Sequence, residues 1–491
     1  MKAREKKRNI HPDWKMSKGE RSAYYMGDIA RLIGMAIVAT YMTTFLAFQG
    51  LSMTALAGFI LLVKIVDAVD DVVFGYFVDK LRITEWKFLK RIVGEGKYMP
   101  WFRLTFAFCP IATILFFLMP GAMPDAAKIA WFTVTYLLYD FSCTLIEVPM
   151  NSLVLTLTDN IDERNNVLKM RGIITVIGAV VAGLALAVLI SESVGIPISV
   201  VAVGVSLICL ATMLPLAIKG KEYNVELKNT EEEKKETYTL RDMWTCIKTN
   251  KYMTIILISE LIACCTATAS AVQGLVSFYL LKNSLFLSIP VLLAFIPAMI
   301  LSGFSDRIAK KFGRKNSLVA CSLIAGAMSL IMYFTGYQNA WLVVLLHTIS
   351  AIPSTIRFIF SGFIAPDTIE YTRYKTGTDC SGIFFAIKSF VTKATYSVGG
   401  SLGLFLMGLF GWIEVNATDF ADLAAQNVMQ PESALNGMWF VYTLVPALGT
   451  IAAAVVMMFY DLKEKDVEFM AQCNAGVITR EACEAQLSRK Y

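Results

Sequence analysis

The sequence has few of the features on which soluble enzymes depend. Its 491 residues include only two histidines, and its ten cysteines form no Cys-x-x-Cys pair. It contains no nucleophile elbow, metal-ligand cluster or nucleotide-binding loop, so we expect no enzyme, no metal site and no cofactor beyond a coupling ion. Strand-type alternation of apolar and polar residues is also absent, which argues against an outer-membrane barrel.

What the chain has in abundance is apolar sequence. Hydrophobic residues make up 56% of it and the mean hydropathy is +0.57, which is too apolar for a soluble domain of this size. A helix needs about 20 apolar residues to cross a bilayer. We therefore predict an all-α integral membrane protein with twelve transmembrane helices, at 24–48, 53–79, 101–120, 127–150, 168–191, 195–217, 251–280, 285–304, 317–336, 340–365, 381–412 and 437–460.

Lysine and arginine are distributed unevenly among the loops between these spans. They are missing near 49–52, 192–195, 337–339 and 414–435, and dense at 1–23, 80–100, 218–249 and 307–315. Because basic loops stay on the cytoplasmic side, both termini are predicted to be cytoplasmic. No cleavable signal peptide is evident, so the first span serves as an uncleaved insertion signal. The net charge of +6 does not indicate nucleic acid, since the basic residues lie in alternate loops.

A single long polar segment divides the chain. Residues 218–249 contain the charge run Glu231–Glu236 and are interpreted as a cytoplasmic linker. They separate an N-terminal six-helix bundle, 1–217, from a C-terminal one, 250–460, which a polar tail, 461–491, follows. A Gly, an Asp and a basic cluster close the second span of both halves, which is the internal symmetry of a transporter built from two related bundles.

Three carboxylates and a lysine interrupt the second span. Asp67, Asp70 and Asp71 stand at i, i+3 and i+4 and share one helix face, and Lys64 lies one turn earlier on that face. Charges at bilayer depth are costly and usually line a water-filled path or an ion site. We predict a cation site for Na⁺ or H⁺, with Lys64 balancing its charge; the alternative is a helix end with solvated acids.

The fourth span carries a second polar face. Asp140, Thr144 and Glu147 stand at i, i+4 and i+7, and we expect Glu147 to pair with Arg171 of the fifth span and to contact substrate. The alternative for this pair is a buried ion pair that only holds two helices together. In the first span, Asp28 and Arg31 are spaced for an intrahelical pair.

Six collinear motifs resemble one family within the major facilitator superfamily, the glycoside–pentoside–hexuronide:cation symporters. They are Tyr25–Asp28, Asp67–Gly75, Glu147–Pro149, Asp162–Arg164 with Arg171, Pro366–Gly377 in the loop after the tenth span, and Ser389–Lys393. The resemblance implies that a cation gradient drives uptake of a sugar, glycoside or uronide in a bacterial plasma membrane. Leu32, Asn151 and Asp379 depart from the family pattern, which leaves open a non-sugar organic solute.

Carried over by position, the resemblance adds roles to the residues already singled out. It places Thr144 with Asp67, Asp70 and Asp71 at the cation. Together with our own interpretation of the charged spans, it gives a substrate site of Asp28, Arg31, Asp140, Glu147, Asn151, Arg171 and Lys393. The expected partners are a small-molecule solute, a monovalent cation and the lipid bilayer, and we expect a monomer.

Charged residues at the predicted cytoplasmic ends suggest a gate formed by salt bridges between the halves. They are Asp162, Arg164, Asp367, Glu370, Arg373 and Lys375. Lys388 is expected to extend to the cytoplasmic surface, whereas the roles of Glu260 and His347 stay open. A non-transporting membrane sensor is the remaining alternative, although linker and tail lack an effector domain.

Overall fold

The computed structural model describes residues 14–80, 83, 86–119, 123–158, 160–223, 248, 250–377 and 381–489. The chain folds into two compact units. The first unit comprises Met1–Ser52, Leu62–Lys235 and Glu414–Val428, and the second comprises Met53–Leu61, Glu236–Ile413 and Met429–Tyr491. The division between them along the chain therefore falls inside the segment 218–249.

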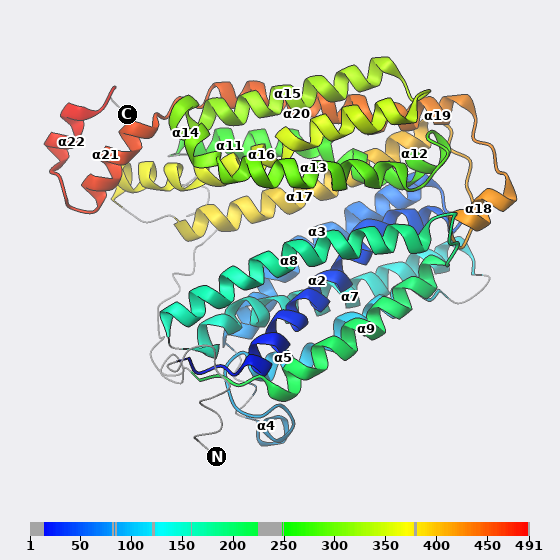
Figure 1. Ribbon diagram of the computed structural model, residues 1–491, viewed down its shortest axis with the longest axis horizontal. Helices are drawn as coiled ribbons and strands as arrows, with labels where there is room; N and C mark the ends of the chain where they lie inside the picture. Colours follow the sequence, from blue (N-terminus) through cyan, green and yellow to red (C-terminus); the bar gives the residue numbers. More distant parts are fainter. Residues whose placement is uncertain are drawn as a thin grey trace. The chain divides into compact units, whose positions relative to one another are not determined.

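Long helices that lie side by side build the first unit (Figure 1). They are α2 (Lys18–Ala47), α3 (Met53–Lys80), α4 (Lys87–Val93), α5 (Met99–Thr105), α6 (Phe108–Phe117), α7 (Asp125–Leu157), α8 (Ile161–Ile190) and α9 (Ile198–Lys219). Helix α2 packs against both α8 and α9, and α6 packs against α7. The buried side chains Tyr24, Phe102, Met150 and Leu216 form the centre of this core.

The second unit repeats this all-helical architecture. Its elements are α11 (Lys251–Ile262), η3 (Ala263–Thr266), α12 (Ala267–Tyr279), η4 (Phe286–Ser288), α13 (Ile289–Gly303), α14 (Ser305–Phe312), α15 (Arg314–Thr335), α16 (Ala340–Thr376), α17 (Ser381–Leu409), α19 (Glu432–Trp439), η5 (Phe440–Leu444) and α20 (Val445–Met458). Helix α15 packs against α16 and α20. Tyr252, Phe360, Tyr371 and Tyr460 are buried at its core.

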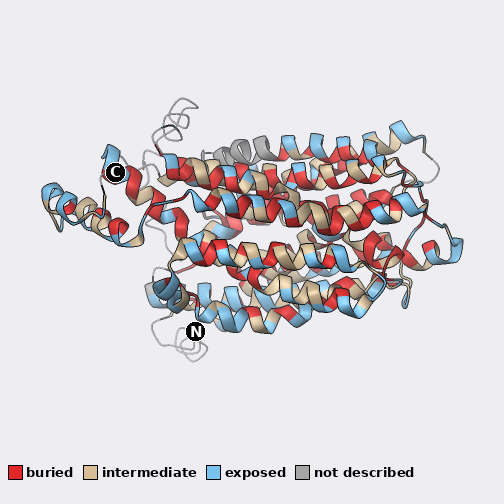
Figure 2. Cartoon of the chain, turned by 90° about the horizontal axis from the view of Figure 1, so that it is seen from above, coloured by how far each residue is buried: buried red, intermediate tan, exposed pale blue. Residues whose placement is uncertain are grey.

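Ten helices or helix series of the described chain are long and apolar enough to cross a membrane. They are α2, α5–α6, α7, α8, α9, α11–α12, η4–α13, α15, α16 and α19–α20. Helices α3 and α17 occupy the other two ranges in which we expected spans. The most apolar window of α8 is only 11% buried, and exposed residues line the outer faces of the helices (Figure 2). Such apolar, exposed surfaces are typical of contact with lipid.

Proline explains where two of these spans depart from a single regular helix. The series α5–α6 is interrupted at Phe106–Ala107, four and three residues before Pro110, whose ring would clash with the carbonyl of residue 106 in an unbroken helix. In the last span, the π-helical turn η5 directly precedes Val445 and Pro446. A π-turn accommodates the hydrogen bond that proline cannot donate.

The prediction that the tenth span ends at 365 and gives way to a loop is wrong. Helix α16 continues through Pro353 and Pro366 to Thr376 and ends at Gly377, which adopts the left-handed conformation with φ 72°. A proline removes only one helical hydrogen bond, whereas a left-handed glycine is a favoured helix terminator. The residues Asp367, Glu370, Arg373 and Lys375 therefore lie on a helix rather than on a loop.

A strap of residues 414–428, which includes the short helix α18 (Phe420–Gln426), belongs to the first unit although it follows α17 of the second. The amide of Gly50 donates to the carbonyl of Val415 and the amide of Ala417 donates to that of Phe48, both at 2.9 Å. The rings of Phe48 and Phe420 meet edge to face. Backbone pairing thus fixes this connection, which has no lysine or arginine, to the end of α2.

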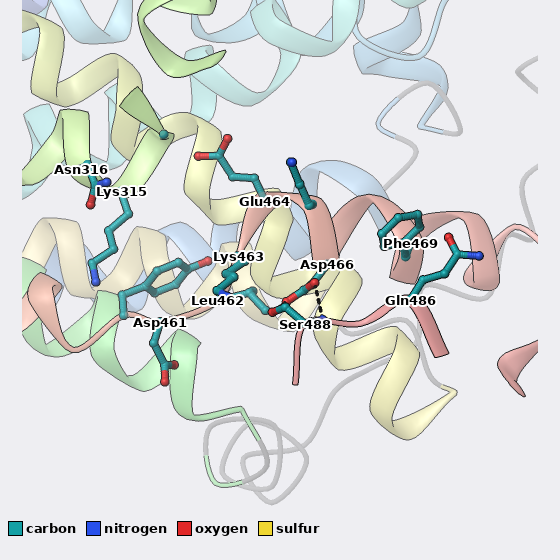
Figure 3. Close-up of a pocket in the computed structure, with 13 residues that line it drawn as sticks. Lys315, Asn316, Asp461, Leu462, Lys463, Glu464, Asp466, Phe469, Gln486 and Ser488 are labelled. Carbon is teal, nitrogen blue, oxygen red and sulfur yellow. Dashed lines mark hydrogen bonds between the residues drawn. The ribbon is translucent and has the colours of Figure 1, made fainter. Parts of the chain in front are cut away.

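The C-terminal tail forms two helices, α21 (Glu464–Asn474) and α22 (Arg480–Gln486), that pack on the second unit. Val467, Met470 and Cys483 join its apolar core, and Asn474 donates to Glu370 at 2.7 Å. Between α21 and the start of α15 lies a cavity of about 590 Å³, which Figure 3 shows with Lys315 and Glu464 at its edge.

Arg489 fastens the end of this tail. Its guanidinium donates to the carboxylate of Asp461 and, at 2.6 Å, to the hydroxyl of Tyr252. The hydrogen bond from Arg489 holds the pKa of Asp461 well below its usual range. A carboxyl with a lowered pKa stabilises the folded state above its unfolded pKa of about 4, and this contribution is lost as the pH falls through the folded value.

We therefore predict that Arg489→Gln releases the tail. Limited proteolysis of the purified protein should cut after residue 461 several-fold faster than in the wild type, because the tail loses the hydrogen bonds from Arg489 to Asp461 and Tyr252. Wild-type resistance should stay constant from neutral pH down to about pH 5. The control is Arg480→Gln, which removes an exposed pair with Glu484; equal cleavage of both variants would contradict the prediction.

Helix α17 crosses the short 3₁₀ turn η3 at very close range. A methyl group added at Gly399 would lie 2.0 Å from the carbonyl oxygen of Cys264, and one at Gly403 would lie 2.9 Å from that of Thr268. Gly400 faces open space. The two contacting glycines therefore permit the backbones to touch, as small residues do in membrane helix pairs.

Replacing Gly399 by alanine should destabilise the second unit by about 2 kcal/mol or more, because the new methyl group overlaps a backbone carbonyl that cannot rotate away. Gly400→Ala is the matched control and should be neutral or slightly stabilising, since alanine favours the helix. Thermal unfolding in detergent, followed by circular dichroism, measures both. Equal melting temperatures for the two variants would refute the close contact.

Candidate functional site

Helices α3 and α7 bring a lysine, an aspartate and a tyrosine together in the first unit. Lys64 Nζ lies 2.9 Å from Oδ2 of Asp67 on the same helix, and 5.2 Å from the centre of the Tyr136 ring. Asp67 and Tyr136 are buried. Lys64 therefore neutralises Asp67, as expected from their spacing, and Tyr136 lies within electrostatic range of both residues and of Asp140.

For the other members of the expected cation site, the structure describes the side chain of Thr144 but not those of Asp70 and Asp71. Asp70 and Asp71 lie on α3, but their side chains are outside the described part of the structure. Thr144 and Asp140 are buried on α7, where the Thr144 hydroxyl lies 3.4 Å from the carbonyl oxygen of Asp140.

A second cluster joins α2, α7 and α8. Asp28, which is 1% exposed, accepts two hydrogen bonds from Arg171: Nε lies 2.7 Å from Oδ2 and Nη2 lies 2.9 Å from Oδ1. Nη2 also donates to Asn151 Oδ1 at 2.8 Å, and the Thr175 hydroxyl lies 3.4 Å from Asp28. This two-pronged pair is the strong form of a salt bridge and fixes the guanidinium plane.

The expected pair between Glu147 and Arg171 is replaced by a different one. Arg31 Nη2 lies 3.2 Å from Asp28 Oδ1, which confirms the intrahelical pair, and Arg31 Nη1 lies 3.7 Å from Glu147 Oε1. Because the buried Asp28 carboxylate offers Arg171 two oxygens, it outcompetes the Glu147 carboxylate, whose side chain is 45% exposed. Asp28 thus connects both arginines, and Glu147 lies at the accessible edge of the cluster.

The sequence analysis missed three contributors to these clusters. They are Tyr24, whose ring lies 5.8 Å from Arg171 Cζ, together with Tyr136 and Thr175. Each stands four residues from a charged residue that we had singled out, and so on the same helix face. That spacing was the available signal. A polar residue four positions before or after a buried charge in a span is therefore a candidate member of the same site.

The chemistry of the Asp28 cluster suits a polar ligand. The carboxylates of Asp28 and Glu147 and the guanidinium groups of Arg31 and Arg171 give a formal charge of zero. A neutral or singly charged ligand can therefore take the place of one of these partners in a hydrogen bond at modest electrostatic cost. Arg171 supplies hydrogen-bond donors and Asn151 supplies a side-chain amide, whereas Glu147 supplies a carboxylate acceptor at the exposed side. Such a set recognises hydroxyl or carboxylate groups.

The second unit contains its own charged groups. Glu260 Oε1 on α11 lies 3.5 Å from Lys388 Nζ on α17, so Lys388 pairs inside the unit rather than extending to a surface as expected. His347 Nδ1 and the Tyr442 hydroxyl are hydrogen-bonded at 2.8 Å. Lys393, the expected substrate ligand, is half-buried on α17.

Residues expected to form a gate have partners within their own unit. Arg314 donates to Asp367 at 2.5 Å, Glu370 accepts from Asn474, and Lys375 donates to the Tyr371 hydroxyl at 2.9 Å. Asp162 and Arg373 are exposed, and Arg164 is half-buried. The neighbour of Asp162, Glu163, is fully buried and accepts hydrogen bonds from the amides of residues 15 and 16. A salt-bridge gate between the halves stays a prediction.

Comparison with known proteins agrees with this architecture. The fold matches that of a nucleoside transporter, NupG, with a TM-score of 0.62 at 12% identity over 90% of this chain and 100% of that one. The protein is therefore a multi-pass membrane protein with a transporter fold. It belongs to the MFS/sugar transport protein family, whose model matches residues 23–464, which confirms the resemblance seen in the sequence and makes it a transporter rather than an enzyme.

Two relatives cover nearly the whole chain. An uncharacterized symporter, YnaJ, of Bacillus subtilis is 26% identical over 93% of this chain and 95% of its own length. A glucuronide carrier protein homolog of Escherichia coli is 24% identical over 90% of this chain and 92% of its own length. The similarity is thus to whole transporters and not to a shared segment.

The Asp28 cluster yields a direct stability prediction. Asp28→Asn removes the only carboxylate that both arginines share and leaves their charges poorly compensated, so it should destabilise the protein by about 3–5 kcal/mol. Asn151→Ala removes one exposed contact of Arg171 and should cost about 1 kcal/mol or less. Thermal unfolding of the purified variants tests this difference; similar losses for both would show that Asp28 does not hold the cluster together.

Proposed function

We propose that this protein is a secondary active symporter that couples a Na⁺ or H⁺ gradient to the uptake of a sugar, glycoside or uronide. The observation that carries the proposal is the pair of charged clusters in the first unit, Lys64–Asp67 and Asp28–Arg171, on helices that the sequence predicts to cross a membrane. Membership of a sugar-transport family and the glucuronide carrier among its relatives support it.

In this proposal the cation binds at Asp67, Asp70 and Asp71 with Thr144. A bound cation displaces Lys64 from Asp67 or shares the Asp67 carboxylate with it. Either event changes the net charge around Lys64 and Asp67, to which Tyr136 and Asp140 are close. The solute binds at the Asp28 cluster, where its hydroxyl or carboxylate groups contact Arg171, Glu147 and Asn151, and Lys393 contributes from α17. Coupling is then a free energy shared between the two sites.

The proposal also takes in the wider architecture. It holds that all twelve predicted spans cross the membrane, that 1–217 and 250–460 form two bundles joined by a cytoplasmic linker, and that the two bundles rock to expose the sites to either side. Both termini are cytoplasmic in this arrangement, and the protein acts as a monomer in a bacterial plasma membrane. The ten apolar helices and the alternating basic loops support it.

Uptake by reconstituted proteoliposomes tests the proposal. A radiolabelled glucuronide, a neutral glycoside and a free uronic acid are each supplied under an inward Na⁺ gradient, an inward H⁺ gradient or neither. We expect one of these solutes to accumulate several-fold above equilibrium under at least one gradient, and Asp67→Asn to abolish accumulation because the cation loses its carboxylate.

The matched control is Asp125→Asn, which changes an exposed carboxylate, 73% accessible, at the start of α7. It should accumulate solute as the wild type does. Accumulation that ignores both gradients would refute symport, and full accumulation by Asp67→Asn would refute the cation site. Failure of every sugar in the panel would favour a non-sugar solute or a sensor.

A further inference from the structure

One charged group of the second unit has no part in the proposed cation and solute sites. It is Glu260, near the end of α11, whose Oε1 lies 3.5 Å from Lys388 Nζ. The two side chains are 22% and 21% exposed. The contact lies inside a span that is otherwise strongly apolar, where a charged carboxylate is retained only for a physical reason.

The second oxygen of this carboxylate is poorly satisfied. Glu260 Oε2 is buried and has no hydrogen-bond partner among the described residues. Glu260 lines a cavity of about 30 Å³ together with Arg357 and Ser361, and the cavity is otherwise mainly apolar. A polar cavity needs only about 10–15 Å³ to hold a water molecule, so the carboxylate has access to a proton donor.

The charged and titratable neighbours of Glu260 come from two of the elements packed around it. Helix α17 contributes Lys388, with Thr392 one turn later, and α16 contributes Arg357. Cys321 of α15 and Tyr396 of α17 interact with Arg357 on its far side. Helices α15 and α20 contribute only the apolar Leu318 and Met457 to the cavity.

These contacts balance two forms of the carboxyl group. In the ionised form Lys388 and Arg357 offset its charge, but Oε2 is buried and has no donor from the protein among the described residues, so only water in the small cavity is left to satisfy it. In the protonated form Oε2 carries the hydrogen and becomes a donor to the cavity, and the attraction to Lys388 is lost. Neither form is fully satisfied, which is the condition for a group that binds and releases protons.

We propose that Glu260 is a proton-binding site of the second unit and that its protonation breaks the salt bridge that joins Lys388 of α17 to the end of α11. The proton adds to Oε2, the carboxylate becomes a neutral carboxyl, and Lys388 keeps its own proton. This inference rests on the proposed function, to which it adds a second ion-binding group, distant in sequence from the Asp67 cluster.

The loss of this salt bridge changes only one of the contacts between α17 and Glu260. The Lys388 salt bridge depends on the charge of the carboxylate, whereas the hydrogen bond of 3.1 Å from the Thr395 hydroxyl to the Glu260 backbone carbonyl does not. Three residues later the span turns into the 3₁₀ segment η3, against which Gly399 packs. A 3₁₀ turn within a helix often marks a hinge, and this one directly follows the titrating group.

Infrared difference spectroscopy tests the proposal without solute or gradient, so its failure is distinct from failure of the uptake experiment. Detergent-purified protein with isotope-labelled glutamate is compared between acidic and alkaline pH. Every labelled glutamate contributes to the carboxylic-acid C=O band at acidic pH. We expect Glu260→Gln to remove one titrating component, and the control Glu468→Gln to keep that component and lose only the contribution of an exposed tail residue.

The variant Lys388→Met provides an independent measurement. Removing a neighbouring cation disfavours the ionised carboxylate, so the band should persist to higher pH by about one unit or more. This holds even if Glu260→Gln fails to fold. The proposal is overturned if Glu260→Gln removes only a component that titrates like that of an exposed glutamate, or if Lys388→Met shifts the midpoint of no component.

Discussion

The cost of placing a charge in an apolar helical interior is the constraint on which the rest of this structure depends. Three charged pairs on otherwise apolar helices follow from it: Lys64 with Asp67, Arg171 with Asp28, and Lys388 with Glu260. A buried ion pair contributes little net stability, but a buried charge that loses its partner is strongly destabilising. The chain thus holds its polar groups ready for a ligand by pairing them with one another.

This constraint also explains how a ligand can replace internal hydrogen-bond partners in a polar site. The formal charge of the Asp28 cluster is zero, and its exposed members, Glu147 and Asn151, lie on α7. In the proposed function, a solute that offers hydroxyl or carboxylate groups replaces contacts there without leaving an uncompensated charge behind. At Lys64 the same logic applies to a cation, because the ammonium group already occupies the position of positive charge beside Asp67.

The helices around these pairs are shaped for movement at defined points. The close contact of Gly399 with η3, the π-helical turn before Pro446 and the break before Pro110 are local departures from regular helix with identifiable causes. The strap 414–428 and the tail helices α21 and α22 add further connections to the ends of their own units. Rigid helices with irregular turns at a few positions are what a rocking carrier requires.

The sequence alone determined everything that follows from the period of a helix and the width of a bilayer. It predicted the helical ranges, the sharing of one face by Lys64 and Asp67, and the pair of Asp28 with Arg31, because residues three apart on a helix are neighbours wherever the helix lies. Only the tertiary structure decided which charged side chains on different helices pair with one another. It gave Arg171 to Asp28 instead of Glu147, joined Lys388 to Glu260, and extended α16 past Pro366 to Gly377. Contacts between helices depend on their rotation and depth of packing, and a one-dimensional pattern of polar residues carries neither quantity.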